Sequence, residues 1–328
     1  MRKRLFVAAM AVAVFAACEK QTVTTPAQEN ETVVLEVNLP DPVTKAVNVS
    51  GEDAVSSYQV FVYSLDSGLL EAYSTMSGTS TSVKMNCRVG SKEVIVLANA
   101  PDLRNVVSLS ALKQTKSLLE HNSVGALVME GHDVVELSAS SSVEIELKRL
   151  VAKIRLTGVT VNFESTAYNG KTFELVSAYL INVAAEKPYL ANVKEDSNAP
   201  TSWYNKLAYV SNASYNSILR DNITSGSNKN YTTEHVFYAY PNPFKTDDFS
   251  STWSSRPTRL VVEAKLDGQL YYYPIALCEL AQNTAYDVSL TITRPGTTDM
   301  NADMTKYEDT FTIKVLEWET GEEVNEIL

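Results

Sequence analysis

The chain has 328 residues and a formal net charge of −11 at pH 7. An acidic balance of this size argues against a nucleic-acid-binding face, which needs clustered basic residues. The hydrophobic fraction of 45% and the charged fraction of 20% are ordinary for a globular protein, and the length fits two sandwich-sized domains.

Residues 1–17 have the composition of a secretion signal. Arg2, Lys3 and Arg4 precede an apolar run that is too short to span a bilayer comfortably. Small residues then come directly before Cys18. This ending resembles the bacterial lipobox, which implies that Cys18 is acylated and becomes the new N-terminus, since acyl chains give stable membrane anchoring. An ordinary signal peptide cut near Ala17 is the alternative.

Residues 18–45 contain a polar spacer and then one short alternating segment. The spacer runs from Glu19 to Asn30 and has no apolar periodicity, so we expect a tether. Period-two alternation follows and predicts a strand with one buried face. Pro40 and Pro42 end this strand, and a tryptic-type bond, Lys45–Ala46, comes soon after. The apolar residues of the strand are Val33, Leu35, Val37 and Leu39.

The first half of the chain then predicts a series of strands and one helix. A helix is expected over 110–119, with Ser110 as its N-terminal cap. The apolar phase of the last segment changes at Lys148–Arg149, which predicts a bulge or a change of sheet. The run at 92–98 is apolar throughout and predicts a central strand buried on both faces. The predicted strands are 57–65, 69–73, 83–87, 92–98, 127–129, 134–137 and 143–161.

The second half begins after a polar stretch at 162–171, where we place the domain boundary. Residues 184–229 have little apolar pattern and predict a long excursion with little regular structure. Asp267–Gly268 joins two strands in the clearest hairpin of the chain. The predicted strands are 172–183, 235–240, 258–266, 269–275, 284–293 and 310–318.

These elements predict an all-β protein of two tandem β-sandwich domains, at 46–165 and 166–328, with one short helix in the first.

Few residues carry a pattern typical of chemistry. His121, His132 and His235 have no metal-ligand spacing, and there is no phosphate-binding Gly-rich loop or nucleophile elbow. We therefore expect no enzyme activity, no cofactor and no metal. Cys87 and Cys278 lie far apart and favour unpaired thiols, although a disulfide stays open. A carbohydrate-binding role would need exposed aromatics, and the candidates are Trp203, Tyr204, Tyr215 and Trp253.

An ordered series of segments, together with the lipobox at Cys18, resembles the fimbrillin family, the FimA-type major fimbrial subunits of type V pili. No single motif carries the resemblance, which runs in order along nearly the whole chain. The segments are YQVFVYSLDSG at 58–68, EVIVLANAP at 93–101, KRLVAKIRLTGV at 148–159, ELVSAYLINV at 174–183, YYYPIAL at 271–277, NTAYDVSLTITRPGT at 283–297 and FTIKVLEWETGEEV at 311–324.

The resemblance implies two transthyretin-like β-sandwiches and a lipoprotein precursor at the outer membrane. It further implies that a trypsin-like protease removes the first strand and that a neighbouring subunit donates a C-terminal strand into the opened groove. On this chain the cut falls after Lys45, and the donor is residues 310–328. The donor side chains would be Phe311, Ile313, Val315 and Trp318. The best-known members are cut after Arg, whereas this link offers only Lys45.

The residues alone, without the family resemblance, are consistent with the same assembly by strand addition. Loss of a strand leaves an apolar groove and open sheet edges, which favour strand addition from another chain. A head-to-tail contact of this kind generates a filament on the cell surface. Two alternatives stay open: a lipid-retaining anchor, accessory or tip adhesin of the same fold, and a stable monomeric lipoprotein in which residues 33–39 are simply the first strand.

Overall fold

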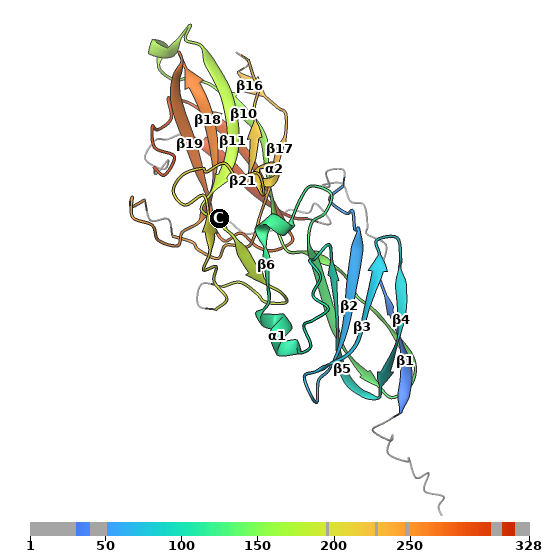
Figure 1. Cartoon of the computed structure of the whole chain (residues 1–328). Helices are drawn as coiled ribbons and strands as arrows, with labels where there is room; N and C mark the ends of the chain where they lie inside the picture. The colour runs from blue at the N-terminus through green and yellow to red at the C-terminus, as the bar shows by residue number, and fades with distance from the viewer. Residues whose placement is uncertain are drawn as a thin grey trace, which may run out of the picture.

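The computed structural model describes residues 31–39, 51–194, 197–226, 229–246, 249–302 and 310–318, with backbone only for 310–311. The protein consists of two β-sandwiches placed end to end (Figure 1). This confirms the predicted all-β, two-sandwich fold. Within the described residues, no helix combines the length and the apolar composition that a membrane span requires.

The first sandwich packs a three-stranded sheet, β4–β1–β8, on a five-stranded sheet, β3–β2–β5–β7–β9. β5 lies between β2 and β7 and is buried from Lys92 to Ala98, so the predicted central strand is confirmed. The bounds are β1 Thr32–Asn38, β2 Ser57–Ser64, β3 Leu70–Ser77, β4 Ser82–Arg88, β5 Gly90–Ala98, β7 Met129–Leu137, β8 Ser141–Glu144 and β9 Lys148–Arg149.

The second sandwich consists of two sheets. The strand order is β16–β10–β20–β21 in one, where β17 also pairs with β10, and β15–β11–β18–β19 in the other. The predicted hairpin β18–β19 is confirmed, and Asp267 and Gly268 both have positive φ, as a tight hairpin turn requires. The bounds are β10 Ala152–Val161, β11 Phe173–Ile181, β15 Arg220–Asn222, β16 Asn230–Tyr231, β17 His235–Ala239, β18 Thr258–Leu266, β19 Gln269–Leu277, β20 Thr284–Ile292 and β21 Thr310–Glu317.

The helix predicted over 110–119 is shorter and starts earlier. It covers Leu109–Gln114, and its cap is Ser108 rather than Ser110, because the Ser108 hydroxyl accepts a hydrogen bond from the Ala111 amide at 3.2 Å. The chain then extends to pair with a segment of the second half, and this tertiary pairing overrides the helical preference.

Over its described residues, 184–194, 197–226 and 229, the excursion contains only short elements, as predicted. The short elements of the chain are α1 Leu109–Gln114, β6 Lys116–Leu118, η1 Leu119–His121, η2 Thr166–Tyr168, β12 Val183–Ala184, β13 Glu186–Pro188, β14 Trp203–Tyr204 and α2 Asn216–Leu219.

The phase change at Lys148–Arg149 is a change of sheet. β9 pairs with β7 of the first sandwich, whereas β10 pairs with β17 and β20 of the second. The second sandwich therefore begins near Ala152, earlier than the boundary proposed at 165. The polar stretch at 162–171 instead connects β10 with β11 inside the second sandwich.

Several contacts tie the two sandwiches together. β6 of the first half pairs antiparallel with β13 of the second. The buried Lys187 ammonium donates to the Glu130 carboxylate at 3.0 Å, and burial lowers the pKa of Lys187. One apolar cluster runs from Phe61 and Ile95 through to Leu260 and Val288. The sandwiches therefore share packing and do not merely follow one another.

We expect the substitution E130Q to lower the free energy of unfolding by about 3 kcal/mol, because it leaves a buried ammonium without its counter-charge. The matched control is D267N, which removes the charge opposite Lys171 in an exposed pair and should cost far less than E130Q, because water screens an exposed ion pair. Urea unfolding followed by circular dichroism measures both. Equal costs for the two variants would contradict a structural role for the Glu130–Lys187 pair.

Candidate functional site: the β1 strand and its groove

β1 is the middle strand of its sheet, although it comes first in the chain. It runs antiparallel to β4, with Thr32 opposite Arg88 and Asn38 opposite Ser82. On its other side it runs parallel to β8, with Leu35 opposite Ser141 and Asn38 opposite Glu144. Because both neighbours come from much later in the sequence, β1 fills a gap between two strands that do not otherwise pair.

The inward face of β1 forms part of the first sandwich's core. Leu35 and Val37 are 0% exposed, and Val33 and Leu39 are also buried. These four side chains belong to one cluster with residues of both sheets. Val34, on the outward face, is 38% exposed. The predicted alternation is thus present, and each fully buried side chain stabilises the sandwich by about 1.5–3 kcal/mol.

Hydrogen bonds fix both ends of this segment. At its start, the Val89 amide donates to the Glu31 carbonyl at 3.0 Å. At its end, the Leu39 amide donates to the Thr81 carbonyl at 2.8 Å, and the Ile145 amide donates to the Asn38 carbonyl at 2.9 Å. The register is therefore set by main-chain pairing along the whole segment, while the side chains determine which face points inward.

The residues around β1 define what would be exposed without it. Met85 and Cys87 of β4 and Val143 and Ile145 of the β8 segment share its cluster. Burial raises the pKa of the Cys87 thiol to about 11, which marks an apolar, unreactive environment. Removing β1 would open an apolar groove between β4 and β8, each with a row of unpaired main-chain groups. Cys278 lies in the other sandwich, and no disulfide joins the two.

The proposed donor segment lies in its own chain's second sandwich. β21 is an edge strand that pairs only with β20, from Thr291 opposite Thr310 to Thr284 opposite Glu317. Val315 is buried, Ile313 is half-buried, and Trp318, directly after the strand, is 0% exposed. The side chain of Phe311 lies outside the described residues. An edge strand has one hydrogen-bonded neighbour, so β21 is held by fewer main-chain bonds than β1.

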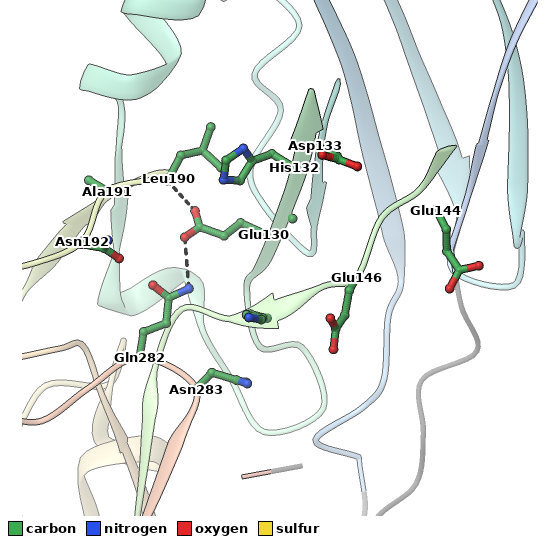
Figure 2. A pocket seen from close by; sticks show the side chains of 12 residues that line it. Glu130, His132, Asp133, Glu144, Glu146, Leu190, Ala191, Asn192, Gln282 and Asn283 are labelled. Carbon is green, nitrogen blue, oxygen red and sulfur yellow. Dashed lines mark hydrogen bonds between the residues drawn. The ribbon is translucent and has the colours of Figure 1, made fainter. Parts of the chain in front are cut away.

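A cleft of about 510 Å³ lies beside the joint of the two sandwiches (Figure 2). The Glu130 carboxylate is used for structure there, because it accepts from the Leu190 amide at 2.7 Å, the Gln282 amide at 3.1 Å and Lys187. His132, Glu144 and Glu146 line the same cleft (Figure 2). Among the residues that the structure describes, no group of His, Cys, Asp and Glu is arranged to hold a metal ion.

The aromatic candidates for carbohydrate binding mostly pack on one another. Trp203 is buried and lies 5.4 Å from Trp253, centroid to centroid, and Tyr204 stacks on the buried Tyr215 at 4.3 Å. His235 is buried between Asp221 and Tyr231, at 2.7 Å from each. These side chains stabilise the second sandwich and present no open aromatic platform.

Three residues of the predicted processing pathway lie outside the described residues: Cys18, Lys45 and Ala46. Sequence reasoning also missed the walls of the groove. Val83, Met85 and Cys87 alternate like β1 itself, and this was the only available signal, because the pairing of β1 with β4 and β8 is long-range.

Comparisons with known proteins give a structural match without a sequence match. No family model matches the chain, and no curated protein matches it. A cell adhesion protein from Bacteroides eggerthii, described as putative, matches with a TM-score of 0.69 at 18% identity, over 90% of this chain and 99% of that one.

Two fimbrial proteins of Porphyromonas gingivalis also match. The fimbrilin FimA matches with a TM-score of 0.65 at 17% identity, over 88% of this chain and 98% of its own. The tip fimbrial protein Mfa3, solved with a C-terminal truncation, matches with a TM-score of 0.54 at 14% identity, over 88% of this chain and 100% of its own. From end to end of its described sandwiches, the chain has the fold of these solved fimbrial and adhesion proteins.

Proposed function

We propose that this protein is a structural subunit of a surface fimbria, assembled by strand exchange. In this proposal β1 is a temporary strand that is removed by cleavage after Lys45. The opened groove between β4 and β8 then accepts residues 310–328 of a neighbouring subunit. The shared fold with fimbrial proteins supports the class of function, and the position of β1 supports the mechanism.

The observation that carries the proposal is that a seven-residue strand, the first described strand of the chain, forms the middle of a sheet whose other two strands come much later in the sequence. Residues 40–50, which follow it in the chain, lie outside the described residues, and the next described strand, β2, belongs to the other sheet of the sandwich. Excision of β1 therefore breaks no other strand, yet it uncovers apolar surface on both sheets of the sandwich. Such a groove favours an added strand over exposure to water.

The donor must match the groove in length and period. β1 has seven residues and β21 has eight, and both are extended with alternating faces. A donor that ran in the direction of β1 would be antiparallel to β4 and parallel to β8, and could reuse the same main-chain partners. Repeated addition from one subunit to the next does not close on itself and so gives a filament.

The cellular pathway belongs to the same proposal. Acylated Cys18 would hold the precursor at the outer membrane, and a trypsin-like protease would cut at Lys45–Ala46 before assembly. The partners are then other fimbrial subunits, the protease and, before cleavage, the membrane. The match to the tip fimbrial protein Mfa3 favours one second candidate, an accessory or tip adhesin or a lipid-retaining anchor of the same fold.

We expect L35A to lower the free energy of unfolding of the uncut protein by about 2–5 kcal/mol, because it leaves a cavity under β1. V34A, on the outward face of the same strand, should change it by less than about 0.5 kcal/mol. Urea unfolding by circular dichroism compares the two. If both variants behave alike, β1 does not contribute the buried face described above.

Mild trypsin treatment of a lipid-free chain that begins at Gln21, after the tryptic site at Lys20, should give one early cut after Lys45, followed by a ladder of multimers. The cut should be early because paired strands resist proteolysis while the predicted link does not. Mass spectrometry locates the cut and native gel electrophoresis follows the ladder. K45A is the control and should keep the link between β1 and the rest of the chain intact and stay monomeric. Resistance at Lys45 in the wild type, without multimers, would favour the anchor or monomer.

Deletion of residues 310–328 should remove the donor but keep the groove. After cutting, this truncated subunit should form no multimers alone, yet it should shorten the ladder of cut wild-type protein by capping its free donor ends. The mixing experiment shows that the truncated chain is folded, because only an intact groove can cap. Multimers from the truncated subunit alone would make the donor assignment wrong.

A further inference from the structure

A cluster of buried charged and aromatic side chains lies at the joint of the sandwiches and is used neither by the groove nor by the packing of β1. It joins residues from three distant parts of the chain. Glu52 follows the segment that contains Lys45, Lys153 lies on β10, and Trp318 directly follows β21. All three side chains are 0% exposed.

The centre of the cluster is an ion pair. The Lys153 ammonium donates to Oε2 of Glu52 at 2.7 Å, and the Tyr238 hydroxyl donates to Oε1 of the same carboxylate at 2.5 Å. Arg149 also binds the segment that contains Glu52. Its guanidinium pairs with Asp53, and its Nε donates to the Glu52 carbonyl at 3.4 Å. Burial lowers the pKa of Lys153, and Glu52 opposes that effect.

The Trp318 indole covers this ion pair. Its ring stacks on Tyr238 with 6.0 Å between centroids and 18° between planes. The Arg149 guanidinium lies 4.7 Å from the ring centroid, and the Lys153 ammonium lies 5.3 Å from it. Cations at these distances attract the face of an indole, and more strongly where water is excluded. The two cations therefore hold the indole in this position more firmly than contacts with uncharged side chains alone would.

The rest of β21 is held less firmly. It pairs with β20 on one side only, and Thr312, Lys314 and Glu317 are exposed. Val315 and Leu316 are buried just before Trp318, so among the side chains described for this strand, 312–318, the buried ones lie at the C-terminal end. Retention of β21 in its own sheet therefore depends on the end that Trp318 anchors.

We propose that Trp318, bound over the Glu52–Lys153 pair, is an autoinhibitory latch that retains β21 in its own sheet until assembly. The inference rests on the proposed function in one respect: β21 must leave this sheet to act as a donor. Glu52 and Asp53 supply the part of the latch that comes from the start of the first sandwich. The latch thus joins the region just after the cleavage link to the strand that exchanges.

Hydrogen exchange of residues 310–318 in the uncut, lipid-free chain tests the latch without any assembly step. W318A should speed exchange of this segment by about tenfold or more, since the strand loses its anchored end. W318F keeps a ring on Tyr238 and should fall between W318A and the wild type. E52Q should also speed exchange, although Glu52 precedes β2 and is not part of β21's sheet, because Lys153 loses its counter-charge.

Two controls guard against general unfolding. W253A removes a different indole that also has cations over its ring. The ring centroid of Trp253 lies 5.2 Å from the Lys206 ammonium and 5.5 Å from the Arg256 guanidinium, and Trp253 is far from β21 in the sequence. It should leave exchange of 310–318 within about twofold of wild type. Exchange in β5 reports whether the first sandwich stays folded. If W318A unfolds it, W318F and E52Q decide the question.

The outcomes separate the latch from the function. Unchanged exchange in W318A and W318F, with β5 intact, overturns the latch. Faster exchange in W318A but not in E52Q overturns the part assigned to Glu52. After trypsin, E52Q should form multimers faster than wild type, because the weakened latch releases β21 more readily. The substitution leaves the donor segment itself unaltered. If exchange responds as expected but no protein forms multimers, the latch stands and the strand-exchange function fails. If multimers form but the substitutions have no effect on exchange, the strand-exchange function stands and the latch fails.

Discussion

A three-stranded sheet depends on its middle strand, and here the middle strand is the first one in the chain. β4 and β8 do not pair with each other, so the main-chain groups that each turns toward the gap between them are satisfied through β1. The same strand supplies four side chains to the core between the two sheets. One short segment therefore determines whether the first sandwich is closed, because a buried strand cannot be lost without exposing both apolar surface and unpaired amides.

The two ends of the described chain are held in different ways. β1 is bonded on both sides and buried along its whole inward face, whereas β21 is bonded on one side and, over its described side chains 312–318, is buried chiefly at Val315, Leu316 and Trp318. A strand held by many distributed contacts leaves only when the chain is cut or the sandwich unfolds. A strand anchored mainly at one end can leave after a single local event. This difference suits β1 as the segment removed and β21 as the segment that moves.

The sequence was informative where the signal is local. Alternation of Val33, Leu35 and Val37 predicted β1 and its buried face, Asp267–Gly268 predicted the hairpin, and the phase change at Lys148–Arg149 predicted the change of sheet. Each of these signals is contained in a few neighbouring residues.

Long-range features could not be predicted in this way. The pairing of β1 with β4 and β8 depends on which strands share a sheet, and alternation alone does not specify that. The helix was placed too far along, because the pairing of β6 with β13 draws the chain out of helix after Gln114. The Glu52–Lys153 pair joins residues that no local pattern connects, and an acidic residue beside a polar link looks solvent-exposed in sequence.

The joint between the sandwiches determines how a subunit would carry load in a filament. In the proposed assembly, each subunit is held by a neighbour at its groove in the first sandwich and through its own donor strand at the second. Tension must then cross the joint, where β6 pairs with β13, Lys187 pairs with Glu130 and Lys153 pairs with Glu52. Buried pairs of this kind lose much when separated, because each ion is left without a partner away from water. A two-domain subunit with such a joint would respond to tension as one body, which a flexible linker between the sandwiches could not achieve.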